Sequence, residues 1–493
     1  MSQPPVRVVI AGGGTAGWIA ATALARQLRR LITVTLVESE EIGTIGVGEA
    51  TIPTARSFHD LLRIDEQAFM KATQATIKLG IRFENWARLG DSYIHSFGAA
   101  PLETWVAGFQ HFWLQARAEG HTGALGDYYA EHVAAEQGRF GKGGDSPLNY
   151  AYHLDAGRYA RFLRQIAEND GARRVEGKIA KVEQHGESGD VSALVLDSGE
   201  RIEGDLFIDC TGFRALLIGE AMGSPYEDWS RWLPTNSAWA VQTEAVAEPV
   251  PFTRAIAHDA GWQWRIPLQE RVGNGIVFCS DYLEPEAARE RLLSSVEGKT
   301  LIEPRLIRYV TGKRREFWKG NCIALGLSSG FVEPLESTSI HLFMVGVTRL
   351  IQQFPFGGIT PALRERYNRM ADHEMERIRD FIVLHYKLTE RDDSPFWQRC
   401  RDADIPDSLA SRIALFEQNA QAWQEPDDLF RSDSWIQVML GQRLQPRHWH
   451  RFGELMAEGR LAAALDDTRA AIARQVAVLP SHQAFLDSYC RAD

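Results

Sequence analysis

Cysteine is scarce in this chain of 493 residues, which has five, and no two of them are spaced as Cys-x-x-Cys. An odd number of scattered thiols argues against a disulfide framework and offers no zinc-ligand spacing, so we expect reduced cysteines and no metal site. The sequence also lacks a run of 18 apolar residues, and it lacks a basic segment followed by an apolar one near residue 1. These absences predict a cytoplasmic protein without a membrane-spanning helix.

An excess of positive charge is missing as well. Lysine and arginine together number 54 against 65 aspartates and glutamates, which gives a formal net charge of −11. Proteins that bind nucleic acids or anionic membranes need a basic face, so this balance argues against both classes. At roughly 150 residues per domain the length corresponds to about three domains. Because the chain has no internal repeats and no low-complexity linker, we expect interleaved modules rather than separable domains.

The first forty residues carry a strand–helix–strand pattern. Residues 7–11 form a short apolar, β-branched run that ends in glycines, residues 18–31 are rich in alanine and leucine, and residues 33–37 are again β-branched. The first and last of these segments are typical of buried strands, and the middle one is typical of a helix. This βαβ opening predicts an α/β protein with a parallel sheet.

A dinucleotide-binding fingerprint lies between the first strand and the helix. Gly12, Gly14 and Gly17 form Gly-x-Gly-x-x-Gly, and Glu38 follows 21 residues after the last glycine. Gly12 permits the tight turn, Gly14 lets the backbone approach a pyrophosphate, and Gly17 allows close helix–strand packing. The helix N-terminus, which includes Thr15 and Ala16, offers N–H donors to an anion. Glu38 is placed to accept hydrogen bonds from the adenosine ribose.

Two further strand–turn segments favour FAD over NAD. Residues 205–213 read Asp-Leu-Phe-Ile-Asp-Cys-Thr-Gly-Phe, and residues 320–330 form another strand that enters a Gly/Ser turn at Gly326. Three such elements spread over 330 residues suit a long, bent cofactor. A second Gly-x-Gly-x-x-Gly that would bind NAD(P)H in its own fold is missing.

Several longer motifs resemble the flavin-dependent tryptophan halogenases. They are Phe-Val-Glu-Pro-Leu-Glu-Ser-Thr-Ser at 331–339, Trp-Gln-Trp-Arg-Ile-Pro at 262–267, Gly-Val-Gly-Glu-Ala-Thr-Ile-Pro at 46–53, Thr-Ile-Lys-Leu-Gly at 76–80, and the segment 205–213. The resemblance implies a Rossmann-like FAD-binding fold of the aromatic-hydroxylase type with an inserted β-sheet on the substrate side. We expect a flavin core at about 1–100, 150–215 and 310–355, a substrate sheet at about 216–309, and a helical C-terminal region, 361–493, that completes the substrate site.

The family reaction defines the expected cofactors and partners. A separate NAD(P)H-dependent reductase supplies FADH2, which is used with O2 and a halide, chloride or bromide, to make hypohalous acid. The acid passes through an internal tunnel to a lysine beside an electron-rich aromatic substrate of the indole type. A homodimer is plausible, and no stable complex with the reductase is expected.

By this resemblance Lys78 and Glu336 are the catalytic residues. Lys78 either hydrogen-bonds and polarises hypohalous acid as an ammonium or forms a haloamine as a free amine. The second route requires desolvation or a base, because an unperturbed lysine has a pKa of about 10.4. Glu336 is expected to pair with Lys78 and orient it, to take the ring proton, or to stabilise the cationic intermediate.

The remaining site residues are implied in the same way. Ser337 couples the lysine side to the flavin side. Thr338 and Ser339 hold the halide, and Ser339 stands where tryptophan-specific members usually have glycine, so its Cβ narrows the halide site or tilts its amide.

The resemblance also implies which residues surround the substrate and the flavin. Trp262 and Trp264 wall off water, since residues two apart on a strand face the same side. The other expected contacts are Ala50 and Leu335 with FAD, and His95, Phe97, Pro334 and Trp435 with the substrate.

The C-terminal region bears on the choice of substrate. Tryptophan-specific members clamp the amino-acid head group with tyrosines and a glutamate, whereas residues 429–443 here lack a Tyr-Tyr pair followed by a nearby glutamate. We therefore expect weak activity on free tryptophan and better activity on indole or another electron-rich arene. The alternatives are a single-component FAD-dependent aromatic hydroxylase, which would accept NADPH directly, and a non-catalytic flavoprotein sensor or binding module.

Overall fold

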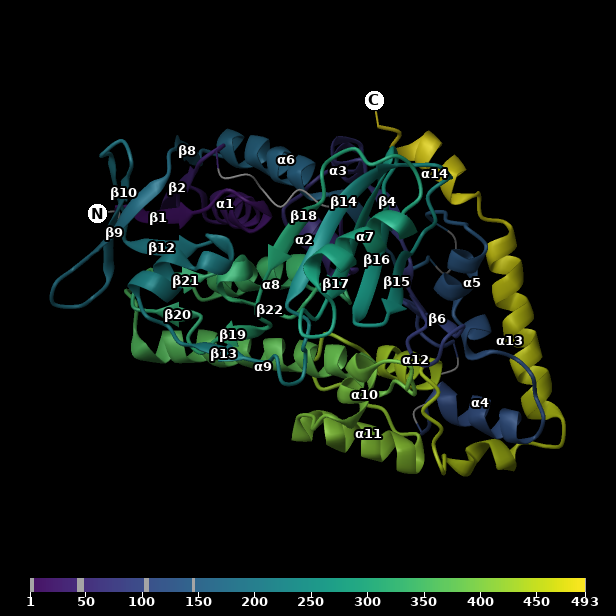
Figure 1. Cartoon of the computed structure of the whole chain (residues 1–493). Helices are drawn as coiled ribbons and strands as arrows, with labels where there is room; N and C mark the ends of the chain where they lie inside the picture. Colours follow the sequence, from purple (N-terminus) through teal and green to yellow (C-terminus); the bar gives the residue numbers. More distant parts are fainter. Residues whose placement is uncertain (1–3, 42–47, 102–105, 144–146, 493) are drawn as a thin grey trace.

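A six-stranded sheet at one end of the molecule contains the predicted βαβ unit (Figure 1). The computed structural model describes residues 4–41, 48–101, 106–143 and 147–492. All neighbouring strands of this sheet are parallel except the edge pair β20–β21, which confirms the parallel α/β core. Its order is β20 (Trp318–Lys319), β21 (Cys322–Ala324), β12 (Leu206–Asp209), β1 (Val6–Ala11), β2 (Ile32–Glu38) and β8 (Arg173–Glu176).

Helix α1 (Thr15–Leu28) forms the centre of this part of the core. It is buried along most of its length, and its alanines allow α6 (Ala156–Asn169) and α8 (Ser339–Gln352) to pack closely against it. The turn between β1 and α1 therefore has a rigid support on several sides. This support fixes the position at which the helix begins.

A seven-stranded, mainly antiparallel sheet forms the second layer. The expected substrate sheet at about 216–309 supplies only five of its strands. The other two, β5 and β6, come from the first hundred residues and extend the sheet because β5 pairs in parallel with β15. The order is β18 (Arg305–Arg308), β14 (Ser237–Glu244), β17 (Arg271–Phe278), β16 (Gly261–Pro267), β15 (Thr253–His258), β5 (Gly80–Glu84) and β6 (Ser92–Ser96).

A small three-stranded sheet lies between the two large ones. Its order is β3 (Gly48–Ala50), β7 (Ala151–Asp155) and β4 (Thr76–Lys78). Two helices precede β4, namely α2 (Thr54–Leu61) and α3 (Glu66–Thr73). The chain breaks between them because Arg63 is left-handed, with φ 50°, and Asp65 is the N-cap of α3. This sheet brings the Gly-Glu-Ala-Thr segment and the Thr-Ile-Lys segment side by side.

The C-terminal third is helical, as expected. Helix α9 runs beneath both large sheets, α13 follows one side of the molecule, and α14 returns to β4 (Figure 1). The remaining helices and strands are short surface elements or lie around this frame. The bounds are α4 (Phe109–Ala118), α5 (Ala130–Glu136), β9 (Ile179–Gln184), β10 (Val191–Leu196), β11 (Arg201–Glu203), β13 (Tyr226–Asp228), α7 (Pro285–Ser295), β19 (Gly312–Arg314), β22 (Gly330–Phe331), α9 (Pro361–Lys387), α10 (Pro395–Asp402), α11 (Asp407–Asn419), α12 (Ser432–Gly441), α13 (Arg460–Ala477) and α14 (His482–Tyr489).

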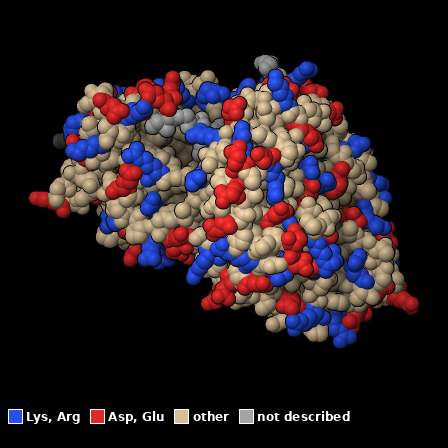
Figure 2. Space-filling model, viewed as in Figure 1, with Lys and Arg blue, Asp and Glu red and all other residues tan. Residues whose placement is uncertain are grey.

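The surface carries both signs of charge. On the face shown in Figure 2, acidic and basic side chains are interspersed, and the surface is hollowed over the region of α1 and β18. Within the described ranges, no helix combines the length and the hydrophobicity needed to cross a membrane.

Candidate active site

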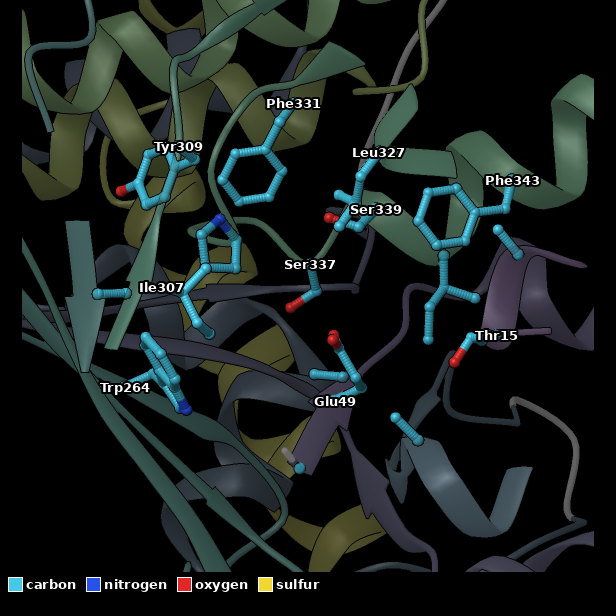
Figure 3. Close-up of a pocket in the computed structure, with 18 of the residues that line it drawn as sticks. Thr15, Glu49, Trp264, Ile307, Tyr309, Leu327, Phe331, Ser337, Ser339 and Phe343 are labelled. Carbon is cyan, nitrogen blue, oxygen red and sulfur yellow. The ribbon is translucent and has the colours of Figure 1, made fainter. Parts of the chain in front are cut away.

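A largely apolar cavity lies where the two large sheets approach each other (Figure 3). The start of α1 forms one wall of it with Gly14, Thr15 and Ala16, and Ala50 of β3 and Leu335 also line it. These five expected cofactor residues therefore lie around one space. Aromatic rings of Phe213, Tyr309 and Phe331 form an adjoining wall and contact one another edge to face or stacked.

The glycines of the fingerprint have the geometry that an anion site needs. Gly12 has φ +105°, and a Cβ there would lie 2.3 Å from the carbonyl oxygen of Cys210. A Cβ on Gly17 would lie 1.9 Å from the oxygen of Gly12, whereas a Cβ on Gly14 would meet nothing within 4 Å. Gly14 caps α1 without a side-chain hydrogen bond, so N–H groups of the first turn remain available to a phosphate. These residues fit a flavin dinucleotide.

Two other expected cofactor residues, Gly326 and Glu38, are not among the residues that line this space. Gly326 has φ +78°, and a Cβ there would lie 2.7 Å from the Cβ of Ala16, so the glycine permits close packing behind the cavity wall. Glu38 does not line the cavity. Its carboxylate accepts hydrogen bonds from Trp18 Nε1 at 3.3 Å and Arg174 Nε at 2.6 Å, and its contact with a ribose remains a prediction.

The two tryptophans of β16 form the wall opposite α1. Trp262 and Trp264 are buried, line the cavity and pack edge to face with ring centroids 6.2 Å apart. The indole N–H of Trp262 donates to Glu333 at 3.2 Å. Pro334, another expected substrate residue, also lines this cavity. The two rings therefore form part of the cavity wall, and their role in excluding water remains a prediction.

Lys78 is at the end of β4 and is fully buried. Its Nζ donates to the carbonyl oxygen of Thr51 at 3.1 Å and to Oγ of Ser337 at 2.8 Å, and it lies 5.3 Å from the ring centroid of Phe97. Burial lowers the pKa of Lys78 from 10.5 to about 7, although the negative charge of Glu336 opposes this shift. The lysine thus has access to both protonation states near neutral pH.

Ser337 connects Lys78 with the cavity. It has φ +59°, and its side chain points into the space between Glu49 and Ser339 (Figure 3). Ser339 begins α8 and lines the cavity, and Thr338 is the buried N-cap of that helix without a side-chain cap hydrogen bond. Free N–H groups at a helix start can hold a halide ion. The roles of Ser337, Thr338 and Ser339 remain predictions.

Glu336 lies on the other side of Ser337, among imidazoles. Both of its oxygens lie 3.0 Å from Nδ1 of His95, and Oε1 lies 2.9 Å from Nε2 of His385. Within the described ranges, no ion pair within 4 Å joins Glu336 to Lys78, so the expected direct pairing does not occur in this structure. Burial alone would raise the pKa of Glu336, but the facing imidazoles of His95 and His385 hold it below its ordinary value.

The expected substrate residues divide into two groups. His95 lies on β6 and Phe97 follows that strand directly, and Phe97 faces Nζ of Lys78. Trp435 of α12 lies farther out and packs edge to face on Phe381 with centroids 4.9 Å apart. Helix α12 is tied to the same strand because Gln437 accepts hydrogen bonds from N and Oγ of Ser96.

The sequence reasoning missed two buried groups and one that is half-buried at the cavity, Glu49. His385 is on α9, about 50 residues after Glu336, and no local pattern distinguishes it. Glu333 and Glu49 belong to motifs that were recognised, but neither was assigned a role. Burial raises the pKa of Glu49, which lines the cavity, to about 7, and it raises that of Glu333 to about 7 against the donors that face it. Residues 46 and 47 of the Gly-Val-Gly-Glu-Ala-Thr motif lie outside the described residues.

Comparisons with known proteins give a consistent result. The profile of the tryptophan halogenase family matches residues 7–458. Tryptophan 6-halogenase SttH of Streptomyces toxytricini is 37% identical over 450 residues, covering 84% of both chains, and tryptophan 7-halogenase RebH of Lentzea aerocolonigenes is 37% identical over 440 residues, covering 84% of this chain and 82% of RebH. Xcc4156, a flavin-dependent halogenase from Xanthomonas campestris, superimposes with a TM-score of 0.98 at 53% identity over 100% of this chain and 99% of its own.

Proposed function

Because the chain belongs to the tryptophan halogenase family, we propose that it is an FADH2- and O2-dependent halogenase that modifies an indole-type arene at Lys78. The observation that carries the role of Lys78 is its hydrogen bond with Ser337, a residue that also lines the flavin-side cavity. One serine therefore touches both compartments. The fold, the family and the flavin dependence agree with this assignment, and the lysine role is the part that needs an experiment.

The cofactor is FAD, which in its reduced form supplies an oxidised halogen, as hypohalous acid, from O2 and a halide ion. A separate flavin reductase must deliver the reduced cofactor, because this chain has only one dinucleotide fingerprint. Gly12, Gly14 and Gly17 shape the phosphate end of its site, and Thr15, Ala16, Ala50 and Leu335 line the cavity. The N-terminal N–H groups of α8 at Thr338 and Ser339 hold the halide.

The residues between the cavity and the substrate guide the oxidised halogen and exclude competing reactions. Trp262 and Trp264 keep water and the arene away from the flavin side, because two buried indoles packed edge to face fill the wall. Ser337 hydrogen-bonds Lys78 and holds its Nζ at the boundary. Lys78 binds the halogen species and presents it to the ring of the substrate, which lies against Phe97 with offset or edge-to-face geometry.

Glu336 acts on the substrate side. Its carboxylate stabilises the positive charge that develops on the ring after halogen transfer and accepts the ring proton, with His95 holding it in place. The substrate is an indole or another electron-rich arene rather than free tryptophan. Gln437, within the segment that lacks the head-group clamp, is already engaged by Ser96 and does not bind a zwitterion.

The proposed cellular location follows from the reductase that supplies FADH2. A reductase that oxidises NAD(P)H works where reduced nicotinamide is available, so we propose a cytoplasmic location and diffusive delivery of FADH2. We also propose a homodimer as the state to test by light scattering.

Lys78→Ala tests the proposal directly. With reductase, FAD, bromide and indole, we expect halogenated product to fall by at least about a hundredfold, since the group that presents the halogen is gone. FAD binding, measured by flavin fluorescence, is expected to be unchanged, and Lys71→Ala on α3 serves as a control. Continued product formation by Lys78→Ala would refute the role of the lysine. Rapid flavin reduction by NADPH without the reductase would instead favour the aromatic hydroxylase.

A further inference from the structure

The wall of the flavin-side cavity contains one carboxyl group among the described residues that line it, that of Glu49 on β3. The other ionisable groups of this wall are the thiol of Cys210 and the phenol of Tyr309, and burial raises both pKa values well above their ordinary range. No lysine, arginine or histidine of the described chain lines the cavity. Glu49 is therefore the one acid of this wall that can ionise near neutral pH.

The carboxyl group of Glu49 has no partner in the part of the chain that the structure describes. The side chain is half-buried and lines the cavity, and its oxygens point across the space toward Ser337 without a hydrogen bond to it (Figure 3). A carboxylate that loses hydration and gains neither a donor nor a cation is disfavoured against the neutral acid. Burial accordingly raises the pKa of Glu49 from 4.5 to about 7.

The charged groups of the strands packed against β3 are neutral or paired. On β7, burial lowers the pKa of His153 well below its ordinary value, so its imidazole is neutral. Asp155 of the same strand forms an ion pair with Arg271 of β17 at 2.6 Å. On β16, Arg265 pairs with Glu297 at 2.7 Å. These groups leave the carboxyl group of Glu49 without a cation that would hold it ionised.

The oxidation of a halide ion to hypohalous acid consumes a proton. With X⁻ for the halide, FADH2 + O2 + X⁻ + H⁺ gives FAD + HOX + H2O, in which the O–O bond breaks and an O–X bond forms. FADH2 and the halide each give up two electrons, which reduce O2. The three hydrogens of HOX and water are the two of FADH2 and one further proton. An acid whose pKa lies near the working pH is the most effective donor of such a proton.

We propose that Glu49 is the proton donor for the formation of hypohalous acid and gives its carboxyl proton to the oxygen atom that leaves as water. Solvent protons then restore the acid. The inference rests on the proposed function, in which Lys78 presents the halogen on the substrate side, and it adds a proton donor on the flavin side. The competing source of the proton is Lys78, which has a pKa of about 7 after burial and hydrogen-bonds Ser337 at 2.8 Å.

The first test follows the ionisation of Glu49 in FAD-free enzyme labelled with 13C at Cδ of glutamate. The signal of Glu49 is identified by its loss in Glu49→Asp, and its chemical shift is followed from pH 5 to pH 9. We expect a midpoint near pH 7. Glu374 is the internal comparison because, although burial opposes the shift, His341 and Arg349 hold its pKa below its ordinary value. Its signal should not titrate in this range.

The second test measures oxidised bromide without an arene. The enzyme is supplied with FAD, flavin reductase, bromide and a β-diketone trap that is calibrated with hypobromite at each pH, and consumed O2 and released H2O2 are recorded. In the wild type, the yield of hypobromite should fall as the pH rises through 7, because Glu49 loses its proton.

Glu49→Gln keeps the shape of the side chain and removes its acidic proton. We expect the hypobromite yield at pH 6 to fall by about a hundredfold and to lose its dependence on pH. Release of H2O2 should rise to match, because FADH2 + O2 gives FAD + H2O2 without a further proton, so O2 consumption continues. Glu49→Asp should restore part of the yield. Glu374→Gln, which changes a glutamate outside the cavity, should equal the wild type.

Three results would overturn the inference. They are a hypobromite yield in Glu49→Gln equal to that of the wild type, a yield in this variant that still falls through pH 7 and so identifies Lys78 as the donor, and a midpoint for Glu49 at or below pH 4.5. The last result decides the question even if Glu49→Gln does not fold. A wild type that releases only H2O2 would refute the proposed function itself, and the inference with it, whereas the other three results leave halogenation intact.

Discussion

Glu333 provides a stability prediction that comes directly from its hydrogen bonds. It is buried at φ +56° and accepts from three neutral donors, Thr235 Oγ1 at 2.7 Å, Trp262 Nε1 at 3.2 Å and Tyr386 OH at 2.9 Å. Burial raises its pKa from 4.5 to about 7, and the donors offset only part of that shift. Within the described ranges, no cation pairs with this carboxyl group within 4 Å.

The sign of the pH effect follows from the direction of this shift. The unfolded chain releases the proton of Glu333 near pH 4.5, whereas the folded chain keeps it up to about pH 7. Stability therefore falls as the pH rises through this window, and it is constant on either side. A difference of about 2.5 pKa units corresponds to roughly 3 kcal/mol at most. With an unfolding entropy of about 2.1 cal/mol/K per residue, that is a shift of about 3 °C in Tm for a chain of this length.

Glu333→Gln isolates this contribution. The amide donates to Thr235 or Tyr386 as the protonated acid does and cannot ionise, so the variant does not lose stability with rising pH. We expect Tm of the variant minus Tm of the wild type to increase by about 2 °C between pH 5 and pH 8 at constant ionic strength. Differential scanning fluorimetry at intervals of half a pH unit measures this difference.

Glu374→Gln is the comparison variant. Although burial opposes the shift, His341 and Arg349 hold the pKa of Glu374 below its ordinary value, so this residue is ionised in both states between pH 5 and pH 8. The difference in Tm between Glu374→Gln and the wild type should therefore not change between pH 5 and pH 8. A flat profile for Glu333→Gln as well would mean that Glu333 is ionised in the folded protein, and the argument from its neutral donors would be wrong.

Two further predictions concern activity. Ser337→Ala removes a hydrogen bond to the Lys78 amine or ammonium; we expect about tenfold to a hundredfold less product with unchanged FAD binding, together with oxidised halogen escaping to a β-diketone trap in the buffer. Equal activity of this variant would contradict the coupling role of Ser337. Indole should be halogenated with at least about a tenfold higher kcat/KM than free tryptophan, since each missing head-group hydrogen bond costs about 1.5–3 kcal/mol. A mass-spectrometric screen with both halides measures this ratio, and free tryptophan as the best substrate would refute the argument from the absent clamp.

The features that were predictable from the sequence are local ones. The turn at Gly12–Gly17 was identified because a β-branched run, three glycines and an alanine-rich helix are adjacent in the chain, and the structure confirms this arrangement. The motifs that include Lys78 and Ser337 were recognised by resemblance. The substrate sheet expected at about 216–309 also proved to contain strands, namely β14 to β18. In each case the residues that form the recognised pattern lie within about twenty positions of one another.

The features that were missed depend on contacts between distant segments. Strands β5 and β6 were assigned to the flavin core because they lie within the first hundred residues, yet β5 pairs with β15 about 170 residues later. Periodicity shows that a segment is a strand but not which sheet it joins. Glu336 was expected to pair with Lys78 for a similar reason, since both were known site residues and His385 was not.

The C-terminal region illustrates how such distant contacts build the site. Three of its helices each hold a site residue or the neighbour of one: His385 of α9 faces Glu336, Gln437 of α12 binds Ser96 next to His95, and His482 of α14 accepts from N of Ile77 next to Lys78. His482 Nδ1 also lies 2.7 Å from the carbonyl oxygen of Pro249, so it donates there and the ring is neutral, in agreement with a pKa lowered to about 4. Residues 361–493 therefore do more than cover the substrate. They fix the backbone on both sides of the lysine and place the imidazole of His385 against Glu336, so a chain that ends near residue 360 would lose the geometry of the centre together with its outer wall.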